Sequence, residues 1–428
     1  MIPAVSTDHD GRIKNLYRVI DERAAHDQPP LLSVSIHHGV VRRDSVTDDL
    51  PRAEDLSNYK ICASGDLVLN RMRAFQGAIG ISRERGLVSP DYLVLRPNRD
   101  VEARYLHHLF RSTWFVGEMV ARLRGIGSTE QGNVRTPRIN AEDLGDIRVA
   151  LPSLAEQQRI AGFLDAETAR IDNLIALRIK QSEILRDRIA QVVDGVTAAS
   201  ADGLSGIGID ASTEDWGVGK LSRLCEIVPG FAFPSSEFLT DGTGMRLLRG
   251  INVTPGAISW REAVGWDIES FPVPERFHLR AGDLVVGMDR PWISEGMRIS
   301  LISEMDLPAL LLQRVACLRP RSAISMQYVY WALNSIHFRL SIESELTGVS
   351  VPHLSGEQIG SFTFRLPPSN LQREISEALA REAKQTHHLK ETLAQQVSLL
   401  AERRAALITA TVTGQIDVST ASGRGIED

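Results

Sequence analysis

Residues 151–193 read LPSLAEQQRIAGFLDAETARIDNLIALRIKQSEILRDRIAQVV, a stretch in which Gly162 is the only glycine and Pro152 the only proline. Pro152 and Ser153, followed by Glu156, form a helix-start signal with serine as the N-cap and an acid three positions later. Apolar residues then return every three or four positions, at Ile160, Leu164, Ile171, Leu174, Leu185, Ile189, Val192 and Val196. This pattern predicts one amphipathic helix of roughly 60 Å, at 1.5 Å per residue.

A helix of this length needs an equally long partner to cover its apolar face. The chain supplies one at residues 366–412, LPPSNLQREISEALAREAKQTHHLKETLAQQVSLLAERRAALITATV, which opens on the same Leu-Pro pair. Its apolar residues follow two seven-residue grids, one of Leu379, Leu393, Leu400 and Leu407 and another of Ile375 and Leu389. Such spacing is typical of a coiled coil, so we expect the two long helices to pack together.

The two stretches begin 215 positions apart, because 366 − 151 = 215, and other segments repeat at nearly the same shift. These pairs are Val134–Ile139 with Val349–Leu354, Leu144–Val149 with Ile359–Phe364, and Gly65–Val68 with Gly282–Val285. Tyr105 and Tyr328 open matching apolar stretches at a slightly larger shift. A duplication of half the chain explains this register, whereas two unrelated domains with a few common motifs would not keep it.

Composition indicates a protein of two or three domains, since 428 residues and 47.2 kDa suffice for a core in each. No apolar run approaches 18 residues, and the first residues lack the basic start and apolar core of a signal peptide. The expected location is therefore the cytoplasm, with no membrane partner. Cys62, Cys225 and Cys317 are isolated, which excludes a disulfide framework or a paired-cysteine metal site.

The net charge of −6 argues against strong general attraction to nucleic acid, but the charge is unevenly distributed. Residues 60–140 carry 13 basic and 7 acidic side chains, a local balance of +6. Of the 48 basic residues 42 are arginine, whose planar fork suits guanine edges and phosphates. Charge alone does not establish DNA binding, because arginine content also follows genome composition.

The sequence contains no complete catalytic motif. A glycine-rich phosphate loop is absent, and Glu382 and Lys384, the only acid-x-Lys pair, belong to the second long helix, far from Pro90 and Asp91. The three histidine pairs consist of neighbours that point apart on a helix or strand, so a shared metal is not expected. The repeated Gly-Asp-Leu-Val predicts a turn followed by a core strand rather than a carboxylate site. These observations predict a binding protein with no catalytic residues and no metal.

The order of the motifs resembles the specificity subunit of type I restriction–modification enzymes over nearly the whole chain. The resemblance rests on Glu156–Ile160 at the start of the first long helix, its weaker repeat Leu371–Ile375, the Gly-Asp-Leu-Val strand in each half, and Thr413–Val418. Single motifs are weak, whereas their tandem order with two spacer helices is specific.

The resemblance implies an α+β fold with two tandem, similar target-recognition domains, separated by two long helices packed as an antiparallel coiled coil in a pseudo-twofold internal repeat. The expected segments are 1–150 (first domain), 151–197 (first helix), 198–213 (flexible linker), 214–365 (second domain), 366–414 (second helix) and 415–428 (tail). The second domain opens at Trp216 with about 30 residues before its strand at Arg246. The first has no comparable tryptophan before Leu31, so we expect it to begin differently or to start late.

The resemblance further implies that each domain binds one half of a split, asymmetric target in double-stranded DNA while the helices set the spacing. Two methylation subunits and, in the full enzyme, two translocating nuclease subunits would supply catalysis. The assembled complex would be a type I endonuclease and adenine-specific methyltransferase. S-adenosylmethionine, ATP and Mg²⁺ are expected in those partners and no cofactor in this chain. The competing hypothesis is a structural tether that joins two protein-binding domains without nucleic acid.

Candidate base contacts are polar side chains in glycine-rich or irregular loops, where binding residues concentrate. In the first domain they are Arg71, Arg73, Gln76, Gln131, Asn133, Arg135 and Arg138. In the second they are Arg246, Arg249, Asn252, Arg290, Arg298 and His353. The ordinary alternative for any one arginine is a solvated charge or an ion pair at the rim of the core, so the loops are better candidates than their individual members.

Overall fold

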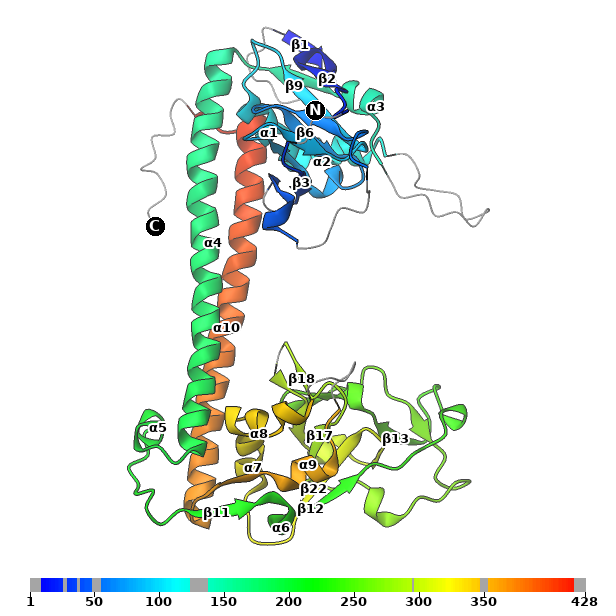
Figure 1. Cartoon of the computed structure of the whole chain (residues 1–428), viewed down its shortest axis with the longest axis vertical. Helices are drawn as coiled ribbons and strands as arrows, with labels where there is room; N and C mark the ends of the chain where they lie inside the picture. The colour runs from blue at the N-terminus through cyan, green and yellow to red at the C-terminus, as the bar shows by residue number, and fades with distance from the viewer. Residues whose placement is uncertain are drawn as a thin grey trace. The chain divides into compact units, whose positions relative to one another are not determined.

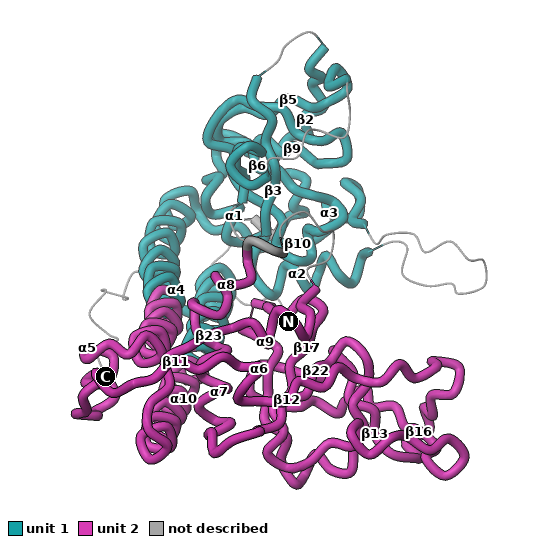
Figure 2. The backbone as a smooth tube through the Cα atoms, turned by 60° about the horizontal axis from the view of Figure 1, so that its bottom comes forward, with its two compact units in different colours: residues 1–179, 394–428 teal, residues 180–393 magenta. Residues whose placement is uncertain are grey.

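The computed structural model describes residues 9–25, 29–36, 39–47, 55–123, 138–294, 296–346 and 353–418. They form two compact units, one of residues 1–179 and 394–428 and one of residues 180–393 (Figure 2). Two helices of 44 residues each, α4 (Leu154–Thr197) and α10 (Ser369–Val412), contribute to both units (Figure 1). We call residues 9–151 lobe 1 and residues 214–366 lobe 2.

Lobe 1 is built on an antiparallel four-stranded sheet in the order β2-β9-β6-β7. Its strands are β2 (Tyr17–Ile20), β6 (Leu67–Asn70), β7 (Ile79–Ile81) and β9 (Tyr92–Pro97). Three further pairs are β1 (His9–Arg12) with β10 (Arg148–Leu151), β3 (Leu32–Ser35) with β4 (Gly39–Arg42), and β5 (Lys60–Cys62) with β8 (Gly86–Val88). The helices are α1 (Ala103–Arg111), α2 (Thr113–Val120) and α3 (Ala141–Gly145).

Lobe 2 has the corresponding antiparallel sheet in the order β12-β22-β17-β20. Its strands are β12 (Cys225–Pro229), β17 (Leu284–Gly287), β20 (Ile299–Leu301) and β22 (Val315–Pro320). A second sheet joins β13 (Met245–Leu248) to β16 (Gly265–Trp266) and, in parallel, to β21 (Ala309–Leu311). The remaining strand pairs are β11 (Gly217–Lys220) with β23 (Thr363–Leu366), β14 (Val253–Thr254) with β15 (Ala257–Ile258), and β18 (Trp292–Ile293) with β19 (Gly296–Met297). Its helices are α6 (Leu221–Leu224), α7 (Met326–Leu333), α8 (Ile336–Leu346) and α9 (Gly356–Ser361).

The internal duplication is confirmed by the strand register. In lobe 1, Asn70 on β6 lies opposite Tyr92 on β9, and in lobe 2 Gly287 on β17 lies opposite Val315 on β22. Both sheets place their strands in the same order, and in each lobe a helix pair follows the strand of the sheet that comes last in the sequence, β9 or β22. The mixed helix and strand content and the two long helices also match the predicted α+β fold class.

The first copy opens with elements in the same order as the second, although it has no comparable tryptophan. Lobe 1 begins with β1, a 3-10 turn and β2, and lobe 2 begins with β11, α6 and β12 in the same order. In both lobes the first strand pairs with the strand that precedes the long helix. Sequence comparison missed the match because these short elements share a pairing partner rather than a residue pattern.

Two local predictions also need correction. The segment 198–213, predicted as a flexible linker, contains the helix α5 (Ala201–Gly206), and a Cβ atom at Gly203 would lie only 2.4 Å from the carbonyl carbon of Gly195. Glycine therefore lets this short helix pack closely on the end of α4. The apolar stretch that Tyr105 opens has helical spacing and so predicts one helix to Leu123, but it forms two helices, because Ser112 is extended and its hydroxyl caps α2 by accepting from Phe115 N.

The long helices are antiparallel within each unit. In unit 1, Ile160 and Leu164 near the start of α4 belong to the same buried cluster as Ile408 and Val412 at the end of α10. In unit 2 the buried cluster joins Val193 and Val196, at the end of α4, to the start of α10 through Ile375 and Leu379, among others. Ion pairs add to each contact, Arg404 with Asp172 at 2.8 Å and Arg188 with Glu382 at 3.0 Å.

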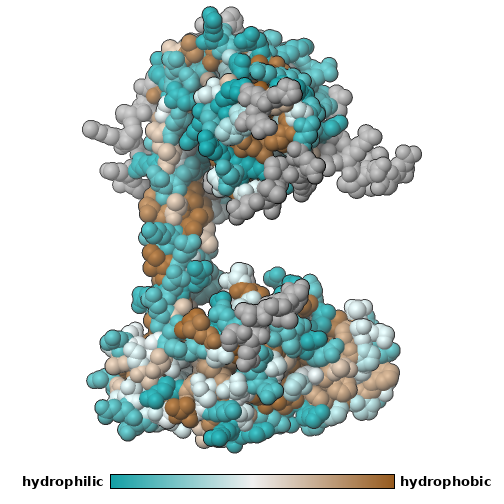
Figure 3. All heavy atoms as spheres, in the orientation of Figure 1, coloured by the Kyte–Doolittle hydropathy of each residue, from teal (hydrophilic) through white to brown (hydrophobic). Residues whose placement is uncertain are grey.

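The predicted apolar grid is not buried along the whole length of the helices. Leu379 and Ile375 are fully buried, whereas Leu389 is 49% exposed and Leu174, on the predicted apolar face of α4, is 38% exposed. Figure 3 shows apolar surface on the long helices. A two-helix contact covers only a narrow stripe, so apolar residues beside it remain open to solvent. None of the helices in the described ranges is long and apolar enough to cross a membrane.

Candidate nucleic-acid interface

In both lobes the aspartate of the Gly-Asp turn before the central strand, β6 or β17, stabilises the fold. Asp66 is buried, accepts from Ala63 N at 2.8 Å and receives both Nε and Nη2 of Arg96 at 2.7 and 2.8 Å. Asp283 accepts from Arg280 N at 2.9 Å and pairs with Arg319 in the same way. This confirms the prediction of a turn followed by a core strand, since these carboxylates hold neighbouring strands together.

A buried glutamine joins each lobe to the start of a long helix. Gln157 accepts from Glu102 N at 2.9 Å and donates to Pro152 O at 2.9 Å. Gln372, 215 positions later, accepts from Ser325 N at 2.9 Å and donates to Pro367 O at 2.8 Å. The two amides are 1% and 3% exposed, so each satisfies two otherwise unpaired backbone groups.

The opposite long helix contributes to each lobe as well. Thr113 N, at the start of α2, donates to Thr409 Oγ1 near the end of α10 at 2.9 Å. Ile336 N, at the start of α8, donates to Asp194 Oδ1 near the end of α4 at 2.7 Å. Each lobe therefore rests on the beginning of one long helix and the end of the other.

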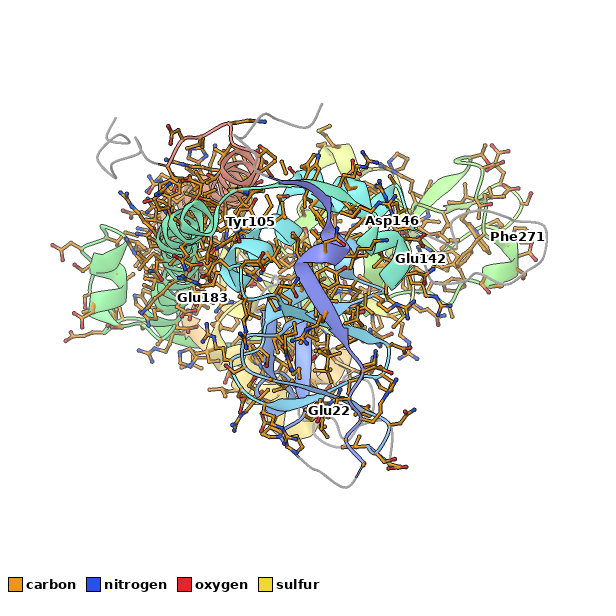
Figure 4. All side chains as sticks on the ribbon, turned by 90° about the horizontal axis from the view of Figure 1, so that it is seen from above. Glu22, Tyr105, Glu142, Asp146, Glu183 and Phe271 are labelled. Carbon is orange, nitrogen blue, oxygen red and sulfur yellow. The ribbon has the colours of Figure 1, made fainter. Side chains whose placement is uncertain are left out.

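Charged groups gather where α1 meets the long helices in unit 1. Tyr105, labelled in Figure 4, is a fully buried residue of the same helix α1. His108 Nε2 lies 2.8 Å from Asp165 Oδ1, and Arg104 Nη1 donates to the other carboxylate oxygen at 3.1 Å. These contacts, chiefly the hydrogen bond with His108, keep the pKa of Asp165 below its usual range. Burial, with smaller effects from His108 and Arg111, lowers the pKa of His107 to about 3.

The low pKa of His107 predicts that unit 1 becomes less stable in mild acid. Between the ordinary histidine pKa of 6.5 and the folded value of about 3, the unfolded chain binds a proton that the folded chain excludes, so stability falls as the pH is lowered through this window. From pH 7.5 to pH 5 the loss is up to about 2 kcal/mol, at 1.36 kcal/mol per pKa unit. Urea unfolding followed by circular dichroism at both pH values measures it.

The matched control is His387, a histidine of α10 whose side chain is 74% exposed. The loss of stability in acid should shrink in His107→Gln and persist in His387→Gln. Equal pH dependence in His107→Gln and in the unchanged chain would contradict the assignment.

The predicted loop residues of lobe 1 follow the end of β6. Arg71 donates to Ile139 O at 3.0 Å and to Asn140 Oδ1 at 2.6 Å, while Ile139 N donates back to Arg71 O at 3.1 Å. Arg71 thus fastens the segment after residue 138 to the strand end. Arg73, Gln76 and Arg138 are exposed at this same edge. Gln131, Asn133 and Arg135 lie outside the described residues, and all seven stay predictions as DNA contacts.

The same edge exists in lobe 2. Leu354 N donates to Met288 O at 2.8 Å, which corresponds to the contact between Ile139 and Arg71. Arg290 is exposed here, and His353 is partly exposed and lies 2.7 Å from Asp289 through Nδ1 and Oδ1. In lobe 2 the end of β17 and the segment after residue 352 therefore place Arg290 and His353 at one edge. In lobe 1 the end of β6 and the segment after residue 137 place Arg73 and Arg138 at the corresponding edge.

The other four predicted residues of lobe 2 make contacts within the fold. Arg246 donates to Leu307 O at 3.0 Å and lies over the Trp260 ring, 4.5 Å from its centre. Asn252 is 1% exposed, with its amide bonded to Arg249 N and to Ser259 O, and Arg249 itself donates to Glu262 O. Arg298 donates to Gly250 O at 3.5 Å. These interactions favour a structural role for Arg246, Arg249 and Asn252.

Two residues beside His353 were absent from the sequence-based candidates. Asp289 lies in the loop after β17 and Arg314 in the turn before β22, and their side chains are 43% and 58% exposed. Asp289 lies between Met288 and the candidate Arg290, so its loop was already predicted as a binding loop. No sequence feature pointed to Arg314, because only strand pairing brings it to this edge. In the described ranges, no three His, Cys, Asp or Glu side chains are grouped as a metal site requires.

Known proteins resemble the chain in sequence and in fold. It is 30% identical over 251 residues to the type I restriction enzyme MjaVIII specificity subunit of Methanocaldococcus jannaschii, a match covering 57% of each chain. It is 33% identical over 163 residues to the type I restriction enzyme EcoAI specificity subunit of Escherichia coli, covering 38% of this chain and 27% of that one. The matches thus span about half or less of these relatives. No known family profile matches the chain.

The fold comparison covers more of the chain. A solved chain from work on complex assembly and conformational transition of the type I R-M system superposes with a TM-score of 0.72 at 18% identity, over 96% of this chain and 99% of that one. The HsdS subunit of Thermoanaerobacter tengcongensis gives a TM-score of 0.50 at 18% identity over 95% of this chain. The chain is therefore a relative, in sequence and in fold, of the specificity subunits of type I restriction–modification enzymes.

Proposed function

We propose that the chain is the DNA-specificity subunit of a type I restriction–modification system. Each lobe binds one half of a bipartite, asymmetric target in double-stranded DNA, and α4 and α10 set the spacing between the halves. The observation that carries the proposal is the duplicated architecture, in which two lobes with the same central sheet each rest on the start of one long helix and the end of the other. A fold match over 96% of the chain supports it.

Under this proposal the chain is a non-catalytic subunit that works in the cytoplasm. Two methylation subunits and two restriction subunits supply the chemistry, with S-adenosylmethionine, ATP and Mg²⁺ bound in those partners. The long helices offer apolar side chains for docking the methylation subunits, since Leu177 and Leu399 in unit 1 are 56% and 63% exposed. Exposed apolar residues on a helix commonly mark a protein interface.

The exposed edges of the two lobes differ, which fits a target with two unlike halves. Lobe 1 presents Arg73, Gln76 and Arg138, whereas lobe 2 presents Arg290 and His353. Arginine and glutamine bind guanine and adenine edges with paired hydrogen bonds, and each good pair discriminates by about 1–3 kcal/mol. Because the chain carries a net charge of −6, the isolated subunit should bind DNA modestly and gain affinity in the complex.

The decisive experiment selects DNA from a random duplex library with the complex of this chain and its methylation subunit. We expect a split motif with two short specified halves. Replacing residues 125–138 by the matching segment of a relative should change one half and leave the other half and the spacing as they were. A complex that binds split-site and random duplexes equally, at several salt concentrations, would instead support the structural tether.

A further inference from the structure

Three positions of lobe 2 correspond to three positions of lobe 1 by strand register. Gly287, the last residue of β17, lies opposite Val315, the first residue of β22, as Asn70 of β6 lies opposite Tyr92 of β9. The second residue after β17 therefore corresponds to the second residue after β6. In the same way, the residue before β22 corresponds to the residue before β9. The segments after residues 137 and 352 match through their bonds to Arg71 and Met288. The equivalent sets are Met72, Asp91 and Arg138 in lobe 1, and Asp289, Arg314 and His353 in lobe 2.

In lobe 2 these three side chains form one polar cluster. His353 Nδ1 lies 2.7 Å from Asp289 Oδ1, and Arg314 Nη1 lies 3.4 Å from the same imidazole nitrogen. Arg314 Nε is 3.8 Å from Asp289 Oδ2. The side chains are 38 to 58% exposed, so ion pairing among them contributes little to stability.

The backbone around the cluster is strained and firmly held. Arg290 and Arg314 have φ angles of 46° and 70°, in the left-handed region that favours glycine. Met288 bridges the segments, because its N–H donates to Arg314 O at 2.9 Å and its carbonyl accepts from Leu354 N at 2.8 Å. Strained residues that the surrounding structure holds in place are concentrated at binding sites.

The two copies are alike where the fold requires it and differ at this cluster. The aspartates of the Gly-Asp turns, their arginine partners and the buried glutamines recur in both lobes. Lobe 1, by contrast, has Met72, Asp91 and Arg138 where lobe 2 has Asp289, Arg314 and His353. An apolar side chain thus corresponds to a carboxylate, a carboxylate to a guanidinium, and a guanidinium to an imidazole. Exposed positions that vary on a shared scaffold are where two lobes can acquire different half-sites.

Building on the proposed function, we propose that Asp289, His353 and Arg314 determine part of the half-site bound by lobe 2. The neutral imidazole of His353 accepts a hydrogen bond from an exocyclic amino group of adenine or cytosine in the major groove. Asp289 is a positioning residue that orients the imidazole, and Arg314 contacts a neighbouring phosphate.

The hydrogen-bonding chemistry fixes the role of each group. A carboxylate only accepts, so the contact of 2.7 Å with Asp289 places a proton on Nδ1 of His353, and Arg314 Nη1, itself a donor at 3.4 Å, makes no hydrogen bond to that nitrogen. When the ring is neutral, Nε2 is then an acceptor. Amino groups on adenine and cytosine are the donors of the major groove. The exposed carboxylate of Asp289 repels phosphate groups, so the imidazole that it orients is better placed to contact the edge of a base. The guanidinium of Arg314 attracts phosphate and offsets this repulsion at the DNA backbone.

The test compares four variants in the complex with the methylation subunit, by library selection and by binding to single-mismatch duplexes. His353→Asn keeps a donor for Asp289 but has no group at the Nε2 position. It should lose about 2- to 13-fold discrimination at one base pair of the lobe 2 half-site, the range for a single hydrogen bond. Asp289→Ala should lose discrimination at the same base pair. Arg314→Ala should weaken binding to all duplexes alike and lower the salt dependence by about one phosphate contact.

His337→Asn is the matched control, because His337 is an exposed histidine of the same lobe on α8. It should leave both half-sites unchanged. If the unchanged complex selects a split motif and His353→Asn and Asp289→Ala select the same motif with equal discrimination, this inference is overturned while the proposed function stands. If the unchanged complex selects no motif, the proposed function itself fails.

Discussion

Replacing Asp283 by alanine is expected to destabilise unit 2 by about 3–5 kcal/mol, the usual cost of removing one member of a buried ion pair. The side chains of Asp283 and Arg319 are 5% and 11% exposed, and the carboxylate receives both Nε and Nη2 of the arginine at 3.0 and 2.9 Å. The substitution also leaves Arg280 N without its acceptor. The guanidinium of Arg319 then keeps its carbonyl acceptors, Arg276 O and His278 O, but loses the carboxylate that is bonded to it on both nitrogens.

Urea unfolding followed by tryptophan fluorescence measures this effect. Five of the six tryptophans lie in residues 180–393 and only Trp114 lies in unit 1, so fluorescence reports mainly on unit 2. Asp66→Ala is the matched variant in unit 1, followed by circular dichroism, and its cost should be smaller because the side chain of Arg96 is 37% exposed and can be hydrated. A double replacement of Asp283 and Arg319 by leucine should recover part of the loss, since no lone charge stays buried. An Asp283→Ala midpoint within error of the unchanged chain would contradict this account.

Replacing Gln372 by alanine is expected to cost about 3 kcal/mol, because two buried backbone groups lose their partners at about 1–3 kcal/mol each. Those groups are Ser325 N, before α7, and Pro367 O, before α10, at 2.9 and 2.8 Å from the amide. Ser325 is the N-cap of α7, so the loss also loosens the contact of lobe 2 with the long helix.

The expected result is a lower urea midpoint by fluorescence and faster amide exchange at the first turns of α7 and α10. Gln157→Ala should produce the corresponding change at α1 and α4, which circular dichroism and exchange detect in unit 1. Glu374→Ala, two positions after Gln372 and exposed, is the control. Protection of α7 that is unchanged in Gln372→Ala would show that the amide does not anchor the lobe.

Much of the architecture follows from the sequence alone because it is encoded locally and twice. Apolar residues at helical spacing, two Leu-Pro starts and a shift of 215 positions suffice to predict two long helices and two similar lobes. The Gly-Asp turn is equally local, since the carboxylate caps a backbone N–H three residues earlier. The opening of lobe 1 was missed because β1 is defined by its pairing with β10, more than 130 positions away.

Which arginines remain exposed is decided only by the tertiary structure. Arg71 and Arg246 look like Arg73 and Arg290 in sequence, yet the fold brings Ile139 O to the first and Leu307 O to the second, from 68 and 61 positions away. Arg314 is placed beside His353 by strand pairing and a left-handed turn. The spacing of apolar residues determines helices and strands because it reflects contacts between near neighbours along the chain. Whether a polar side chain is exposed or is bonded within the fold depends on which distant residues the folded chain brings next to it.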